Sequence, residues 1–192
     1  MDTSVLLAAV QSKSDFKKED FPTLLDLFEE RTFRKGEMIF NAGDIVRCSY
    51  FVLKGCLRLF YVNSEGAERI IYFAIEGWWT GDLMSLLNQT PTTMNLQALE
   101  DCEVLTIKKS NIEHVIKNFP EFAIYQFRNQ TRTVSYFKES IGRDIIESPE
   151  SKYRRFTREH PDLLLRLPLY HIASYMGITP ETLSRIRKKT SV

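Results

Sequence analysis

The sequence has few of the residues that build disulfide scaffolds or metal centres. Its 192 residues include three cysteines and three histidines, and no two cysteines form a C-x-x-C pair. This spacing argues against a disulfide framework, an iron–sulfur cluster and a zinc ribbon. The histidines are too far apart in the sequence to predict a metal site. No metal or other cofactor is therefore expected from these six residues, which are Cys48, Cys56, Cys102, His114, His160 and His171.

Long hydrophobic runs are also absent. The run from Ile70 to Ile75 is the length of a strand and stops at Glu76, whereas a membrane span needs roughly 18 residues. The apolar run from Val5 to Val10 has no basic region ahead of it, so no export signal is expected. With 43% hydrophobic and 27% charged residues, the composition is typical of a soluble globular protein. The expected location is the cytoplasm.

Net charge is +1, but positive and negative residues are unevenly distributed. Residues 1–150 hold 17 Lys+Arg and 22 Asp+Glu, a balance of −5, whereas residues 151–192 hold 9 and 3, a balance of +6. A basic terminal segment on an acidic body is expected when one end of a protein meets a polyanion. A solvated charged face is the alternative interpretation of the charge alone.

Residues 31–108 predict a β-structure. Short apolar runs alternate with turns that contain Gly or Asn, a pattern typical of an antiparallel β-roll of the jelly-roll, or double-stranded β-helix, kind. A cupin-type enzyme would need histidine ligands within these strands; because residues 31–108 contain no histidine, the protein is not expected to be an enzyme. The predicted strands are Met38–Phe40, Tyr50–Leu53, Leu57–Tyr61, Ile70–Phe73 and Val104–Ile107.

From residue 110 onward the pattern predicts helices, so the overall fold class is α+β. Ser110 and Glu113 have the spacing of a capping box, and a long helix is expected over 121–146. Its apolar stripe, at steps of three and four residues, favours a homodimer interface; docking on the protein's own β-domain is the alternative. The stripe residues are Val134, Phe137, Ile141 and Ile145, of which the first three are the expected interface residues.

The N-cap and N1 pair Ser148-Pro149 predicts the start of a new helix and a domain boundary. We expect three parts. Residues 1–119 would form a sensor roll, 120–147 a dimerisation helix and linker, and 148–192 a DNA-binding domain.

The stretch from Leu167 to Thr190 predicts a helix-turn-helix. A first helix would end near Met176, with Gly177 in the left-handed conformation that helix ends favour. Thr179 and Pro180 would then cap and open a second helix. Helix, tight glycine turn and second helix form the motif that places a recognition helix in the DNA major groove.

The second helix has the chemistry that major-groove binding needs. Arginine donates to guanine and carboxylates accept from cytosine N4, whereas hydroxyls and lysines contact phosphates without reading sequence. A helical hairpin with a charged outer face is the simpler alternative. The expected DNA-binding residues are Thr179, Glu181, Thr182, Ser184, Arg185, Lys188 and Lys189, while Leu183 and Ile186 are expected to pack inward.

The order of roll, long helix and helix-turn-helix resembles the Crp/Fnr family of bacterial transcription regulators. The resemblance is carried by GITPETLSRIRKK, by Gly55-Cys56-Leu57-Arg58 and by Gly81-Asp82-Leu83. It implies a homodimer that binds a near-palindromic DNA site, with RNA polymerase and a small-molecule effector as further partners. It also implies that Glu181 and Arg185 read bases, and that Thr179, Thr182 and Lys188 contact phosphates.

The sequence departs from the family pattern in two places near the recognition helix. Pro180 stands where several members have a further base-reading arginine, which puts part of the usual half-site preference in doubt. The three residues Thr190-Ser191-Val192 are too few for a C-terminal wing, so a full wing is not expected.

The ligand cassette of the roll also departs from the pattern of cyclic-nucleotide-binding members. Asp82 replaces a ribose-binding glutamate, and Thr92 replaces a phosphate-clamping arginine. Because no Lys, Arg or His occurs from Trp78 to Leu99, a buried phosphate would have no cation here, and we expect no useful cyclic AMP binding. A ligand-binding or interaction module that does not bind DNA is the alternative function. The expected pocket residues are Gly81, Asp82, Leu83, Thr92 and Thr93.

Overall fold

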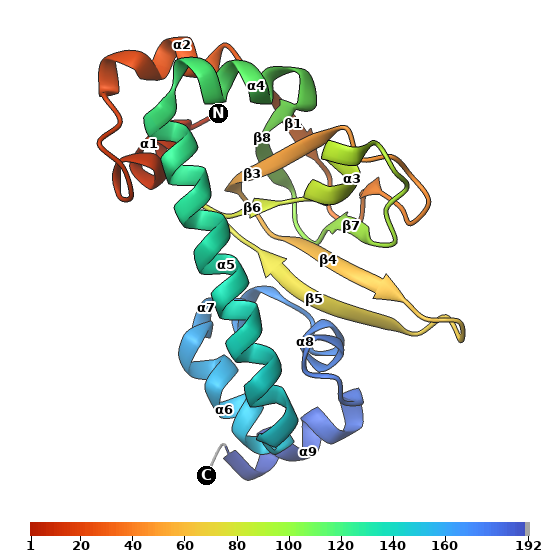
Figure 1. Ribbon diagram of the computed structural model, residues 1–192. Helices are drawn as coiled ribbons and strands as arrows, with labels where there is room; N and C mark the ends of the chain where they lie inside the picture. Colours follow the sequence, from red (N-terminus) through yellow and green to blue (C-terminus); the bar gives the residue numbers. More distant parts are fainter. Residues whose placement is uncertain (191–192) are drawn as a thin grey trace. The chain divides into compact units, whose positions relative to one another are not determined.

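The computed structural model describes residues 1–190, which form two compact units. The first unit comprises residues 1–61 and 72–132, and the second comprises 62–71 together with the chain from 133 onward. The structure therefore combines strands and helices in an α+β fold, with an antiparallel roll followed by C-terminal helices (Figure 1).

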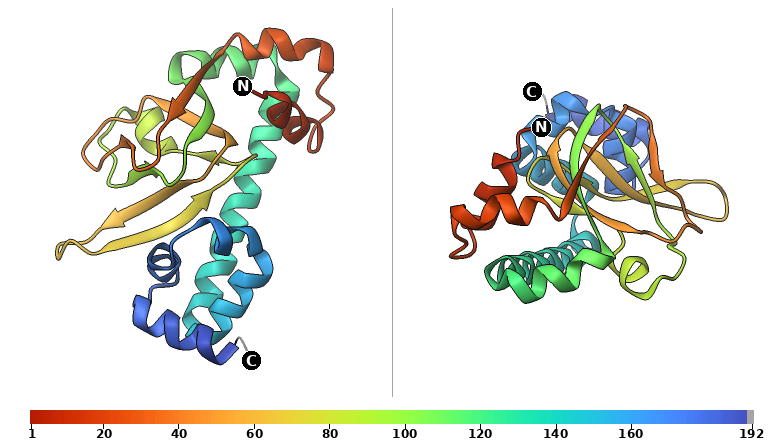
Figure 2. Two further views of the ribbon diagram at one scale, coloured as in Figure 1. Left: turned by 180° about the vertical axis from the view of Figure 1, so that it is seen from behind. Right: turned by 90° about the horizontal axis from the view of Figure 1, so that it is seen from above.

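Within the described residues, the strands form two four-stranded sheets with the orders β1-β8-β3-β6 and β2-β7-β4-β5. Register pairs such as Tyr50↔Thr106 and Leu59↔Leu96 show the antiparallel ladders, and Figure 2 shows the sheets from two further sides. The strands are β1 Phe28–Phe33, β2 Met38–Phe40, β3 Cys48–Lys54, β4 Leu57–Val62, β5 Glu68–Ala74, β6 Trp79–Thr80, β7 Asn95–Ala98 and β8 Cys102–Lys108.

The five strands predicted from apolar runs are all present, with ends that differ by up to two residues. Strand β1 extends the β-region toward the N-terminus, and β6 and β7 were not predicted. Strand β7 escaped because Asn95 and Gln97 interrupt its apolar pattern, although Asn95 is buried and binds backbone groups. No side chain fits at position 55, because a Cβ on Gly55 would lie 2.6 Å from the Cys102 sulfur.

Strand β3 separates two hydrophobic cores, which explains why its sequence is apolar almost throughout. Side chains of a strand alternate between its two faces. Tyr50 and Val52 face the interior of the roll, while Phe51 and Leu53 belong to a second cluster outside it. The roll interior is filled by apolar side chains from several strands, among them Phe40, Leu57, Leu59, Leu96, Ala98 and Val104.

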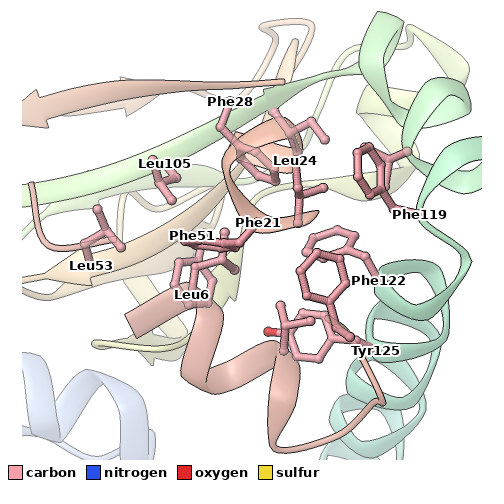
Figure 3. Packing of buried hydrophobic residues seen from close by; sticks show 14 residues of the cluster. Leu6, Phe21, Leu24, Phe28, Phe51, Leu53, Leu105, Phe119, Phe122 and Tyr125 are labelled. Atoms are coloured by element: carbon pink, nitrogen blue, oxygen red, sulfur yellow. The ribbon is translucent and has the colours of Figure 1, made fainter. Parts of the chain in front are cut away.

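The second cluster is covered by helices from both ends of the first unit. In Figure 3 the side chains of Phe122 and Tyr125 point toward those from the N-terminal segment and from the sheet. Trp79 lies against this cluster, and its Nε1 donates to the Tyr125 hydroxyl at 3.0 Å. The helices of this unit are α1 Ser4–Gln11, η1 Lys18–Asp20, α2 Phe21–Leu25, α3 Leu83–Asn88, α4 Lys109–Asn118 and the first part of α5 Pro120–Ile146.

Helix α5 confirms the long helix expected over 121–146, but the predicted capping box before α4 is wrong. Lys108 occupies the N-cap position of α4 and makes no side-chain cap bond, while Ser110 lies inside the helix. The physical reason is that β8 runs directly into α4, so the helix begins before the serine. The Ser110 hydroxyl instead donates to the side chain of Asn111.

Up to residue 190, where the description of the chain ends, the second unit holds the rest of α5 and four further helices. Ser148 caps the first of them as predicted, its hydroxyl accepting from the Ser151 amide at 3.2 Å. The helices are α6 Pro149–Glu159, α7 Pro161–Arg166, α8 Leu169–Met176 and α9 Pro180–Thr190. The three-part division at residues 119 and 147 stays a prediction.

Candidate nucleic-acid interface and ligand cassette

The turn between α8 and α9 has the geometry expected of a helix-turn-helix. Gly177 ends α8 with φ +68°, the left-handed conformation that favours glycine. The Ile178 amide donates to the Ala173 carbonyl, as in a Schellman-type helix end. Thr179 then caps α9, because its hydroxyl accepts from the Thr182 amide at 3.2 Å.

The inner faces of α8 and α9 form a small apolar core. Leu183 and Ile186 are buried as predicted, so successive turns of α9 anchor it from one side. Burial of both side chains leaves the opposite face of α9 to solvent. The core residues contributed by the two helices are Ile172, Ala173, Met176, Leu183 and Ile186.

His171 also lies in this region, near the start of α8. Its side chain is 6% exposed, and the centroid of its ring lies 4.1 Å from that of the Tyr170 ring. Because three consecutive residues, 171–173, are buried, α8 is covered on more than one side.

The seven predicted DNA-binding residues lie along one helix and its cap. All of them are exposed except Thr182, which is half-buried. Its hydroxyl accepts from both Thr179 Oγ1 and Arg185 Nη2 at 3.2 Å. The amide of Glu181 itself and then the Thr179 hydroxyl lower the pKa of the Glu181 carboxyl, which favours the ionised form that accepts hydrogen bonds.

Not all of the basic charge in residues 151–192 faces outward. Arg155 bonds Asp144 and Glu147 at 3.2 and 3.1 Å, and Lys152 pairs with Asp144 at 3.5 Å. These ion pairs tie α6 to the end of α5, so the two cations have a structural role. Lys189 lies 3.7 Å from Glu150. The positive charge on the outer face of α9 is thus smaller than the net charge of +6 over residues 151–192 indicates.

The cassette of the roll is held together by its own polar side chains. Asp82 caps α3, with one carboxylate oxygen accepting from the amides of Met84 and Ser85 at 3.0 and 3.1 Å. The other oxygen accepts from the Thr92 hydroxyl at 2.7 Å. Thr92 is 3% exposed, and its oxygen also accepts from the Met94 amide. The position where the resemblance implies a phosphate clamp is therefore bonded to the capping carboxylate.

The structure brings only some of the predicted pocket residues together. Gly81, Asp82 and Thr92 converge, whereas Leu83 and Thr93 are exposed. Ser85 was not predicted, yet its buried hydroxyl accepts from the Val46 amide and donates to the Thr90 carbonyl. No local signal marks this role, because the Val46 amide lies 39 residues away in the sequence.

The tryptophan and cysteine side chains take part in packing. Trp79 joins the second core, and Trp78 packs against the roll interior. All three cysteines are buried, and burial raises the pKa of the Cys102 thiol to about 11. No group of three or more potential metal ligands occurs within the described part of the chain.

Helix α5 carries an exposed apolar stripe with a seven-residue repeat. Phe127, Val134 and Ile141 are exposed by 72%, 57% and 63%. Ile124 and Ile145 occupy the other coiled-coil position before and after them, and Thr131 and Lys138 occupy that position between them. Phe137 is half-buried and its ring contacts Tyr136. The 127–134–141 spacing was present in the sequence, but the predicted stripe began only at Val134.

The model of the cyclic nucleotide-binding domain family matches residues 30–119. The cyclic AMP receptor protein of Thermus thermophilus is 25% identical over 174 residues, covering 88% of this chain and 79% of the relative. The nitrogen fixation regulation protein FixK of Bradyrhizobium diazoefficiens is 27% identical over 164 residues, covering 80% and 68%. The fumarate and nitrate reduction regulatory protein of Vibrio cholerae is 24% identical over 168 residues, covering 82% and 66%.

Solved structures share the fold. The global regulator CLP of Xanthomonas campestris superposes with a TM-score of 0.76 at 13% identity, covering 91% of this chain and 92% of that one. FixK2 of Bradyrhizobium japonicum superposes with a TM-score of 0.73 at 20% identity, covering 84% and 83%.

The roll, the long helix and the C-terminal helices give the chain the same fold as CLP and FixK2. Bacterial regulatory proteins are among its sequence relatives. The chain is thus similar over most of its length to regulators of the Crp/Fnr type, and residues 30–119 match the cyclic nucleotide-binding domain family.

Proposed function

We propose that the protein is a homodimeric transcription regulator that reads a near-palindromic DNA site with α9. The observation that carries this proposal is the recognition helix itself. It has a formed glycine turn, a threonine cap and a buried inner face. Its outer face presents Glu181, Arg185 and Lys188 to solvent.

The roles of the α9 side chains follow from their chemistry. Arg185 reads guanine through its O6 and N7, and the ionised Glu181 accepts from cytosine N4. Lys188, near the helix C-terminus, contacts phosphate and fixes the register. The remaining residues of the interface, Thr179, Thr182, Ser184 and Lys189, support phosphate binding.

The homodimer is formed through α5. The exposed stripe would otherwise leave large apolar side chains in water over several turns, and an a/d pattern is the seam of a two-stranded coiled coil. Val134 and Ile141 lie at the centre of this seam, and Phe137 flanks it. A two-fold dimer places two recognition helices in successive major grooves about 34 Å apart.

The roll does not bind cyclic AMP with useful affinity. A phosphate at the start of α3 would meet the Asp82 carboxylate, which already accepts from the first amides of that helix. Two like unit charges about 4 Å apart repel by about 4 kcal/mol at the effective dielectric of a protein surface. Breaking the Asp82–Thr92 bond adds to that cost.

The proposal also assigns partners and location. DNA and a second copy of the chain are the partners, RNA polymerase is a further one, and an effector of unknown identity binds the roll if the protein senses a small molecule. No enzymatic activity is proposed, and the role belongs to the bacterial cytoplasm, where the DNA is. No helix in the described part of the chain is long and apolar enough to cross a membrane.

Selection of bound duplexes from a randomised DNA pool tests the central claim. The purified full-length protein is used with and without cyclic AMP at one stated salt concentration, because affinity depends strongly on salt. A two-fold-symmetric site enriched in both samples supports the proposal. Enrichment only with cyclic AMP contradicts the cassette interpretation, and no enrichment in either contradicts DNA recognition by the protein as purified.

Two substitutions then separate base reading from phosphate binding on the selected site. Arg185→Ala should cost about 1–3 kcal/mol and relax the preference at one base pair of each half-site. Lys188→Ala should weaken all sequences alike and reduce the salt slope by about 1. Lys54→Ala, an exposed lysine in β3, is the control. Equal losses on specific and random DNA for Arg185→Ala would remove its base-reading role.

A further inference from the structure

The turn that joins β4 and β5 contacts the helix-turn-helix within the second unit. This β4–β5 turn, residues 62–71, clusters with the C-terminal helices. Asn63 shapes it, its side chain accepting from the amides of Glu65 and Ala67. The contact joins the start of β5 to the last residues of α8 and to the glycine turn.

The Ser174 hydroxyl makes the hydrogen bonds to the backbone of β5 that a neighbouring strand would make. Its hydroxyl donates to the Glu68 carbonyl at 2.8 Å and accepts from the Ile70 amide at 3.2 Å. Strand β5 is the last in its sheet, so these bonds lie along a sheet edge, where backbone groups can pair with another segment. One side chain of α8 thus satisfies both groups.

Arg69 makes the second half of the contact. Its Nη1 donates to the Ser174 carbonyl at 3.2 Å, at the end of α8 where a cation is favoured. The guanidinium also lies against Gly177, because a Cβ on that residue would be 1.7 Å from Nη1. The glycine therefore supplies both the left-handed turn and the space that Arg69 fills.

We infer that Ser174 and Arg69 make the β4–β5 turn a brace that holds α8 and the glycine turn in the conformation that presents α9 to DNA. The inference rests on the proposed function. It is a support and not an autoinhibitory contact, because the hydrogen bonds reach Ser174 of α8 and the guanidinium lies beside Gly177. The α9 side chains Glu181, Arg185 and Lys188 stay exposed.

The experiment compares Arg69→Ala, Ser174→Ala and the double variant with wild type in the full-length protein. Arg47→Ala and Ser151→Ala, at exposed positions outside the brace, are the matched controls. Affinity for the selected DNA site is measured by fluorescence anisotropy at several salt concentrations. Amide exchange of residues 68–70 and 173–178 is measured without DNA.

Each single substitution should lower affinity about fivefold, the loss expected from one net hydrogen bond. The double variant should lose little more than the weaker-binding single variant, since both act through one contact. Exchange should rise at residues 68–70 and 173–178, base preference should stay that of wild type, and the salt slope should not change.

Several results would overturn the inference. Unchanged affinity with faster exchange would make the contact structural only, and raised affinity would make it autoinhibitory. A salt slope reduced by about 1 in Arg69→Ala alone would make Arg69 a phosphate contact. These outcomes require that wild type binds its site, whereas wild-type failure to select any DNA would refute the proposed function as well.

Discussion

Replacing Asp82 with alanine tests how strongly the cassette is held closed by the protein's own side chains. The substitution removes the acceptor for the amides of Met84 and Ser85 and for the Thr92 hydroxyl. Losing a helix N-cap costs about 1 kcal/mol. A buried polar group left without a partner costs about 1–3 kcal/mol more. The Thr92 hydroxyl is 3% exposed; in the variant it still accepts from the Met94 amide but loses the acceptor for its own proton. The expected loss in the free energy of unfolding is about 2–4 kcal/mol.

Urea unfolding followed by tryptophan fluorescence measures this loss in the roll itself. The sequence holds two tryptophans, Trp78 and Trp79, so the signal comes from next to the cassette. With a slope of about 2 kcal/mol per molar urea, the midpoint should fall by about 1–2 M. Asp26→Ala, an exposed aspartate at the end of α2, is the control.

Asp82→Asn separates the cap from the charge. Asparagine caps helices about as well as aspartate, but its amide nitrogen cannot accept from the Thr92 hydroxyl. The midpoint should therefore fall by about 0.5–1.5 M, less than in Asp82→Ala, because only the Thr92 bond is lost. An unchanged midpoint in Asp82→Ala would show that the cassette bonds do not hold the roll together. The argument against a bound phosphate would then lose its support.

Three further predictions concern the dimer, the pH dependence and the thiols. Ile141→Lys places a charge in the α5 seam and should convert dimers to monomers in sedimentation velocity, whereas an unchanged dimer mass would refute the seam. Burial lowers the pKa of His160, so the folded protein binds a proton on this ring at lower pH than the unfolded chain. As pH falls below about 6.5 the unfolded chain binds the proton first and stability decreases; His160→Gln should flatten thermal unfolding midpoints measured from about pH 7 to 5, and an identical slope would contradict this. Because Cys102 is buried and its thiol pKa is raised to about 11, it should resist alkylation at about pH 8 until urea unfolds the chain. Rapid labelling of the native protein would show that the thiol is accessible.

The features that the sequence predicts well are those coded by neighbouring residues. Gly177 marks the end of α8, Thr179 caps α9 three residues before the amide it accepts from, and Ser148 does the same for α6. Such signals depend on local backbone geometry, which the adjacent residue types determine. The capping box at Ser110 failed for a related reason, since the strand before it continued directly into the helix.

Turn residues, caps and apolar periodicity were therefore enough to predict the β-roll, the long helix and the helix-turn-helix. Which side chains meet across the chain depends instead on how distant segments pack. Asp82 bonds Thr92 ten residues away, Arg155 of α6 pairs with Asp144 of α5, and Ser174 reaches β5 from more than a hundred residues further along. The physical reason is that hydrogen bonds and ion pairs act over a few ångströms of space, and residue spacing alone does not say which distant segments the packed core brings within that reach.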